Sequence, residues 1–334
     1  MSSAPTAEEI ARDATWLAQA LGPSTGMVRL ITMSRESYRA ASFLDDRMLQ
    51  QPVDGQVVVP WRDVAAAVAG ELRADARWIF HIGHVGSTLV SRLLGEIDGV
   101  LAVREPRLLR DLAICPPQIR SEHIGSVPKL VSRTFAAREL ACVKATSFAS
   151  EIAPELVPSG ECALFMYAMP AIYIASILAG ENSLKELRRL ADFRLARLAM
   201  RSIDLPSARH EADLAAIAWA CEMTALEAAA EAMPDRHIAW TDFDAMLANM
   251  EAELSRVAQF FDFDEDVAAI ATGPLMSRYS KALEHAYSPN LRRQLIGETS
   301  EQHGHEIDAA LAMLDSAAEK SPLLARALSR AGGS

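Results

Sequence analysis

Two glycines and two hydroxyl residues lie between an apolar run and a helical pattern, an arrangement that can bind an anion. Segment 78–94 begins with β-forming residues, breaks at Gly83 and Gly86, and resumes with leucines at helical spacing. It therefore predicts a strand, a tight loop and a helix. Glycines permit positive φ in the loop, and the amides of Ser87 and Thr88 are unpaired donors at the helix start. Such a loop can hold a phosphate or sulfate group.

The glycine spacing excludes a Walker A loop. That loop has four residues between its glycines and a lysine before the hydroxyl residue. Here two residues intervene, and no lysine follows Gly86. The plain alternative is a glycine turn between any strand and helix of an α/β fold, and this segment alone does not separate the two interpretations.

Two other predicted strands have a charged residue at their carboxyl end. Glu105 comes directly after the strand 100–104, and Lys144 ends the strand 140–144. Short apolar runs followed by helical patterns are typical of buried parallel strands in βα units. Since open α/β sheets bind ligands at the carboxyl ends of their strands, we expect both side chains on the same edge as the glycine loop. The alternatives are a first-turn helix acid for Glu105 and a surface lysine for Lys144.

The elements that must position these residues form an α/β core with helical additions. Further strands are predicted at 162–167 and 238–240, and long helices at 183–200 and 208–233. We divide the chain into a mainly helical extension (1–75), an α/β domain (76–272), and a C-terminal loop and helix that pack on it (273–334). Smaller predicted elements are helices at 7–21, 35–49, 61–73, 126–138 and about 302–318, and a short strand at 28–33.

Composition narrows the class of protein further. Half of the 334 residues are hydrophobic, with neither a membrane-length apolar run nor a signal peptide, so we expect a cytoplasmic protein that does not bind a membrane. The net charge of −11 argues against nucleic-acid binding, although a local basic pocket is compatible with it. The four cysteines lack metal-ligand spacing, so no metal site is predicted.

Several of these segments together resemble the sulfotransferase family. Gly86-Ser87-Thr88-Leu89 is similar to the first family signature, which wraps the 5′-phosphosulfate of the donor 3′-phosphoadenosine 5′-phosphosulfate (PAPS). Arg104-Glu105-Pro106 lies where bacterial and tyrosylprotein-type members place a catalytic glutamate. Val143-Lys144-Ala-Thr146 resembles the family's Lys-Thr/Asp-Pro element without its proline. Segment 165–176 resembles the part that binds the 3′-phosphate, and segment 238–262 a late family element, so the resemblance covers roughly residues 77 to 265.

The resemblance implies a three-layer, P-loop-like parallel sheet flanked by helices, and it assigns roles to particular residues. Glu105 is the expected general base, Lys144 stabilises the departing bridging oxygen, and His84 contacts the transferring group. Ser176 is expected at the 3′-phosphate. PAPS, or its product adenosine 3′,5′-bisphosphate, is further expected to contact Gly83, Gly86, Ser87, Thr88 and Leu89.

Two positions depart from the family pattern. The first-motif Arg or Lys is His84 here, and the Arg eight residues before Ser176 is Ala168. Each change removes a strong phosphate-binding cation. Arg278 and Lys281, in a late loop, are candidates to replace the missing cation. The arginines of the helix at 186–201 are also candidates, the plain alternative for them being a solvated face.

The preferred hypothesis is a sulfotransferase-like enzyme that transfers a sulfuryl group from PAPS to a hydroxyl or amine of a small-molecule acceptor. Its rival is a degenerate, non-catalytic relative that binds a phosphorylated or sulfated ligand or a partner protein. A third hypothesis is a nucleotide-dependent phosphotransferase. The sequence argues against it, because neither the expected lysine nor an evident magnesium-binding carboxylate is present. The sequence leaves open the acceptor's identity and whether the protein forms a homodimer.

Overall fold

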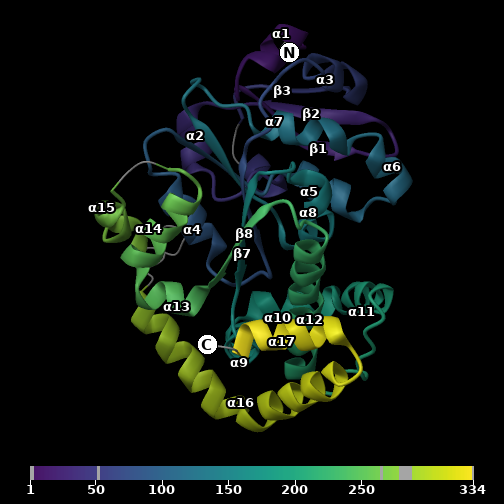
Figure 1. Ribbon diagram of the computed structural model, residues 1–334, viewed down its shortest axis with the longest axis vertical. Helices are drawn as coiled ribbons and strands as arrows, with labels where there is room; N and C mark the ends of the chain where they lie inside the picture. Colours follow the sequence, from purple (N-terminus) through teal and green to yellow (C-terminus); the bar gives the residue numbers. More distant parts are fainter. Residues whose placement is uncertain (1–3, 51–52, 264–265, 278–287, 333–334) are drawn as a thin grey trace.

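A five-stranded parallel sheet lies at the centre of the computed structural model, which describes residues 4–50, 53–263, 266–277 and 288–332 (Figure 1). Its strand order is β5 (Val100–Arg104), β6 (Leu140–Lys144), β4 (Arg77–His81), β7 (Cys162–Tyr167) and β8 (His237–Asp242). All neighbouring strands pair in parallel. The predicted α/β fold class, with a parallel sheet flanked by helices, is confirmed.

Helices cover both faces of this sheet. The crossover through α4 (Ser87–Leu94) runs from β4 towards β5, whereas the crossover from β7 to β8 through α9 (Pro170–Leu178) and α12 (Glu211–Glu231) runs the other way along the sheet. Because both crossovers are expected to be right-handed, they lie on opposite faces. The chain reverses direction along the sheet next to β4, and ligands of open α/β sheets bind at such a switch point.

The remaining elements of the core are mostly short helices. The helix predicted over 126–138 is shorter than expected, the one over 183–200 is divided in two, and the last predicted helix is longer and is followed by another. Their bounds are α5 (Arg107–Ile114), α6 (Pro117–Ser121), η2 (Ile124–Ser126), α7 (Val127–Val131), η3 (Ser147–Ile152), α8 (Ala153–Leu156), α10 (Glu181–Arg189), α11 (Ala191–Met200), α13 (Phe243–Ala248), α14 (Met250–Phe260), α15 (Ala268–Ala271), η4 (Pro274–Ser277), α16 (Pro289–Ala318) and α17 (Pro322–Gly332). Within the described residues, no helix is both long enough and apolar enough to cross a bilayer.

The N-terminal part contains a three-stranded antiparallel sheet, of which the prediction of a mainly helical extension over 1–75 included only the strand at 28–33. The helix predicted over 7–21 ends early, and its second half is a strand that pairs with the next one. Leucine and alanine favour helices, but pairing and burial override that propensity here. The elements are α1 (Ala7–Arg12), β1 (Trp16–Gly22), β2 (Met27–Thr32), α2 (Arg35–Ala40), η1 (Asp46–Gln50), β3 (Gln56–Pro60) and α3 (Trp61–Ala67).

This N-terminal sheet shares one hydrophobic core with the α/β part. The buried guanidinium of Arg133 donates to the main-chain oxygens of Ile10, Asp13 and Trp16. The carboxylate of Asp111, on α5, accepts from the amide of Leu21 at 2.9 Å. Side chains of the α/β part thus satisfy backbone groups of the N-terminal sheet.

Candidate active site

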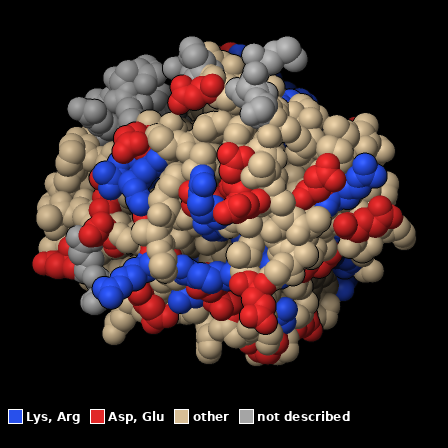
Figure 2. All heavy atoms as spheres, turned by 90° about the horizontal axis from the view of Figure 1, so that it is seen from above, with Lys and Arg blue, Asp and Glu red and all other residues tan. Residues whose placement is uncertain are grey.

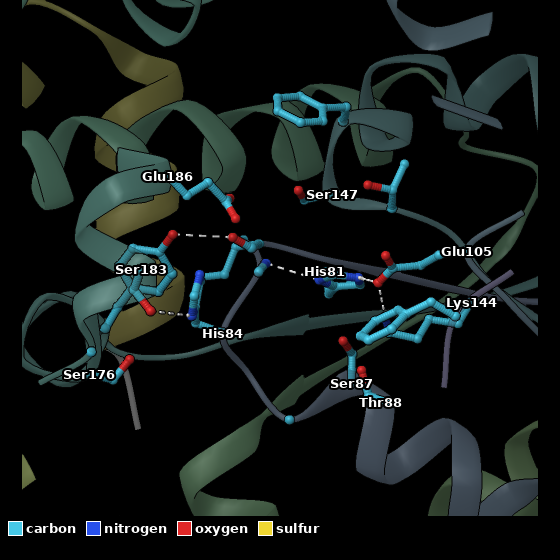
Figure 3. A pocket seen from close by; sticks show the side chains of 18 of the residues that line it. His81, His84, Ser87, Thr88, Glu105, Lys144, Ser147, Ser176, Ser183 and Glu186 are labelled. Carbon is cyan, nitrogen blue, oxygen red and sulfur yellow. Dashed lines mark hydrogen bonds and ion pairs between the residues drawn. The ribbon is translucent and has the colours of Figure 1, made fainter. Parts of the chain in front are cut away.

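A cavity of about 690 Å³ lies at the carboxyl edge of the parallel sheet. Its wall brings together all the predicted site residues that fall within the described part of the chain (Figure 3). Arg278 and Lys281 lie outside the described residues. The predicted residues in the wall are Gly83, His84, Gly86, Ser87, Thr88, Leu89, Glu105, Lys144 and Ser176.

The loop after β4 has the backbone geometry of an anion cradle. Gly83, His84 and Gly86 all have left-handed φ angles, of +81°, +54° and +60°. Helix α4 begins directly after Gly86 and has no side-chain cap at its N-terminus. Ser87 is buried in its first turn and lines the cavity with its neighbour Thr88. The first amides of α4 are therefore placed to bind an anion in the cavity.

Gly86 is required by its neighbour as well as by its φ angle. A Cβ atom at this position would overlap the ring of Phe243. Phe243 is the first residue of α13, is 2% exposed and lines the cavity beside the loop. The loop can therefore run beneath this ring only because residue 86 has no side chain.

Glu105 and Lys144 form a buried ion pair at the ends of β5 and β6. The two strands align Arg104 with Lys144, and the amide of Glu105 donates to the Lys144 carbonyl at 2.7 Å. Glu105 has a φ of +51°, which costs a non-glycine residue roughly 1–2 kcal/mol. Such strained residues cluster at functional sites. The Lys144 side chain is only 1% exposed and that of Glu105 13%.

The surroundings of Glu105 keep its carboxyl group ionised. Burial raises the pKa of Glu105, but the Lys144 ammonium and the His81 ring lower it by more, so the net direction is downward. The other carboxylate oxygen, Oε2, lies 3.3 Å from Nη2 of Arg47, a residue of η1. Glu105 is therefore an anion at neutral pH, and the Lys144 and Arg47 cations and the His81 ring hold it from three elements.

His84 lies on the other side of the loop from Glu105 (Figure 3). Its Nδ1 is 3.5 Å from the hydroxyl oxygen of Ser183, and its ring meets that of Tyr173 edge-on. Ser176 is one turn after Tyr173 on α9, and its Oγ is buried without a hydrogen-bond partner among the described residues. His84 and Ser176 thus define one end of the cavity, and Glu105 defines the other.

Cations outnumber acids in the cavity wall although the whole chain is acidic. Seven Lys and Arg residues line it against four Asp and Glu residues, counted over the described residues. On the face shown in Figure 2, by contrast, basic and acidic side chains are interspersed. This local surplus favours an anionic ligand. The cations besides Lys144 are Arg47, Arg107, Arg110, Arg189, Arg194 and Arg292.

Most of these cations, and His81, were not identified from the sequence. Arg189 and Arg194 belong to the arginine-rich segment for which a solvated face was the alternative, and they line the cavity. Arg188 does not: it pairs with Glu211 on the surface. The signal for His81 was a polar residue at the end of an apolar strand, directly before the glycine loop. The contribution of Arg47 depends on tertiary folding and left no local signal.

Comparisons with known proteins find similarity only among solved structures. No protein-family model and no curated protein matches the chain. It is similar to the "Sulfotransferase Domain from the Curacin Biosynthetic Pathway", with 11% identity, a TM-score of 0.40, and coverage of 70% of this chain and 99% of that one. It is also similar to the "Sulfotransferase Domain from the Synechococcus PCC 7002 Olefin Synthase", with 13% identity, a TM-score of 0.39, and coverage of 69% and 94%. Likeness this weak carries no argument about substrates.

Proposed function

We propose that this protein transfers a sulfuryl group from PAPS to a hydroxyl or amine of a small-molecule acceptor, with Glu105 as the proton acceptor. The observation that carries the proposal is one shared cavity. An uncapped helix start behind a left-handed glycine loop opens into the same space as a buried Lys–Glu pair. The cationic surplus of the wall supports an anionic donor.

Several polar groups of the chain fit the two phosphate positions of this donor. The amides of Ser87 and Thr88 would hold the 5′-phosphosulfate, and the buried Oγ of Ser176 would bind at the 3′-phosphate. Ala168 carries no cation, and we assign its part to Arg194. That residue is 6% exposed and lines the cavity, and its Nε and Nη1 have no hydrogen-bond partner among the described residues.

Arg194 is not left without acids nearby. Its Nη2 is 3.7 Å from Glu186, and its Nε is 3.9 Å from Glu222. Both contacts are longer than charge-assisted hydrogen bonds. Glu222 is held more closely by Arg197, at 2.6 Å. The guanidinium of Arg194 therefore keeps donors for a phosphate oxygen.

The reaction needs positioning and charge stabilisation more than covalent help from the protein. The acceptor's proton passes to Glu105, and its oxygen or nitrogen forms the new bond to sulfur. The bond between sulfur and the oxygen that bridges it to the 5′-phosphate breaks. Its electron pair remains on that oxygen, where the Lys144 ammonium stabilises the negative charge. Phe43, Arg107 and Phe148 line the same cavity as Glu105, and the acceptor would lie against this part of the wall.

Nucleotide binding tests the proposal directly. Adenosine 3′,5′-bisphosphate should raise the melting temperature, because a ligand at 100 times its Kd stabilises the fold by about 2.7 kcal/mol. Glu105→Gln should keep this nucleotide-induced rise and lose turnover with PAPS. Arg194→Gln should reduce the preference for the bisphosphate over adenosine 5′-monophosphate. The absence of any rise at millimolar bisphosphate would refute the proposal.

A non-catalytic relative that binds a phosphorylated or sulfated ligand is the second candidate function. It is favoured by the absence of cations at His84 and Ala168 and by the ion pairing that makes Glu105 a weak base. A screen of phenols, alcohols and amines with radiolabelled PAPS separates the two functions. Transfer to any acceptor excludes this candidate, whereas nucleotide binding without transfer across the screen supports it.

A further inference from the structure

We propose that His81 is a positioning residue that links the glycine loop to the carboxylate of Glu105. His81 is the last residue of β4, is 6% exposed and lines the cavity. Figure 3 shows its ring between the loop and Glu105. The inference deepens the proposed function, because its activity measurements rest on sulfuryl transfer.

One ring nitrogen of His81 is engaged by the loop. Nδ1 accepts a hydrogen bond from the amide of Gly83 at 2.9 Å. A ring nitrogen that accepts a hydrogen bond carries no proton, so in the neutral ring the proton is on Nε2. The bond also directs the Gly83 amide to the protein and leaves the amides after Gly86 for a bound anion.

The other ring nitrogen faces the acid. Nε2 of His81 is 3.6 Å from Oε1 of Glu105, the same oxygen that pairs with Lys144. This distance is longer than a hydrogen bond, so the contact is an electrostatic one between an N–H group and a carboxylate. It lowers the pKa of Glu105 together with Lys144.

The two carboxylate oxygens of Glu105 therefore have different partners and different roles. Oε1 faces both Lys144 and His81, whereas Oε2 faces Arg47, whose side chain is half-exposed. The acceptor's proton therefore goes to Oε2. His81 itself is not the base, because one ring nitrogen is used by Gly83 and the other faces Glu105 with its proton.

Two amide substitutions separate the two ring contacts. In His81→Asn, the amide oxygen lies at the level of Nδ1, so the Gly83 contact is kept and the Glu105 contact is lost. In His81→Gln, the amide nitrogen reaches the level of Nε2, so the reverse holds. His237→Asn and His237→Gln are matched controls, because His237 is exposed at the amino end of β8.

The two variants should fail in different ways. His81→Asn should bind adenosine 3′,5′-bisphosphate within about 2-fold of wild type. It should lower kcat about 10-fold, because the carboxylate of Glu105 is no longer held in position, and it should move the acid limb of the pH profile upward, because a contact that lowers the pKa of Glu105 is lost. His81→Gln should weaken bisphosphate binding about 5-fold while keeping the wild-type acid limb. Equal effects of the two variants on binding and on kcat would refute the proposal.

A measurement independent of turnover separates this inference from the proposed function. Nitrogen-15 NMR of the His81 ring in the full chain should show an unprotonated Nδ1 and a protonated Nε2 at neutral pH. The opposite tautomer would overturn the inference even if the protein transfers sulfuryl groups. Conversely, the expected tautomer without any bisphosphate binding would leave the His81 contacts standing and refute the proposed function.

Discussion

Adding one methyl group at either loop glycine tests whether the cradle has the geometry described. Gly83→Ala and Gly86→Ala both place alanine at a positive φ, of +81° and +60°, which costs roughly 1–2 kcal/mol. At Gly83 the new Cβ meets nothing within 4 Å, so strain is the whole cost. At Gly86 it overlaps the buried ring of Phe243, and such overpacking adds about 1–3 kcal/mol. Gly86→Ala should therefore be the more destabilising by about 1–3 kcal/mol.

Urea denaturation of both variants at neutral pH measures this difference as a shift in midpoint at unchanged m. In a double-mutant cycle, Gly86→Ala and Phe243→Leu together should cost at least about 1 kcal/mol less than the sum of their separate costs, because substitutions of residues in contact are not additive. The same pair of substitutions at Gly83 and Phe243 should be additive. Equal losses for the two alanine variants, or additivity at Gly86, would refute the packing of the loop beneath this ring.

Two further predictions concern the buried ion pair. Lys144→Met should destabilise the fold by about 3 kcal/mol, because it leaves the Glu105 carboxylate without its main partner. The double variant Lys144→Met/Glu105→Leu should be less destabilised than Lys144→Met alone. Urea midpoints of the wild type and the two variants measure both differences. The folded pKa of Glu105 is lowered from its ordinary value of 4.5. The contribution of this carboxylate to the free energy of unfolding is therefore complete above that pH and is lost as the pH falls towards the folded pKa, at roughly 1.4 kcal/mol per pH unit. Stability measured from pH 6 down to pH 3 should therefore fall less steeply in Glu105→Gln than in wild type, and parallel curves would contradict the assignment.

The sequence predicted the parts of the site that depend on local patterns. A strand, a glycine loop and a helix leave a signal in consecutive residues, and so do an acid or a lysine at the end of an apolar run. Once parallel strands are assumed, their carboxyl ends must share an edge, which places Glu105 and Lys144 on the side of the loop. The cavity wall contains them all. The roles of these residues in chemistry stay predictions.

The sequence did not predict the parts that depend on tertiary packing. Residues 16–22 have the composition of a helix, and only pairing with β2 makes them a strand. Arg47 precedes Glu105 by 58 positions, and nothing near it in the chain marks it as a partner of that acid. The sequence places His81 in an apolar strand and gives no sign of its contact with Glu105, because the partners of a side chain at a strand end depend on how neighbouring strands are arranged.

The segment that connects β2 to β3 contributes to the site, and two consecutive residues hold it there: Arg104, which ends β5, and Glu105, which follows it. Arg104 is 2% exposed, and its guanidinium donates to the carbonyls of Tyr38, Arg39 and Ala41 at the end of α2. Burial and the charge of Arg92 lower the pKa of Arg104 to about 9. The carbonyls at a helix C-terminus carry partial negative charge, so they stabilise this cation where no carboxylate is paired with it among the described residues.

The same contact fixes the segment that follows α2. The amide of Leu44 donates to the Arg104 carbonyl at 2.7 Å, and Phe43 beside it lines the cavity. From there the chain reaches Arg47, which stacks on Phe43 and lies against Glu105. Arg104 therefore anchors the N-terminal segment, and Glu105, the next residue, receives a charged partner from the same segment. The wall beside the acid is consequently built in part by Phe43 and Arg47, which lie outside the α/β core, and its shape depends on the folding of the N-terminal part.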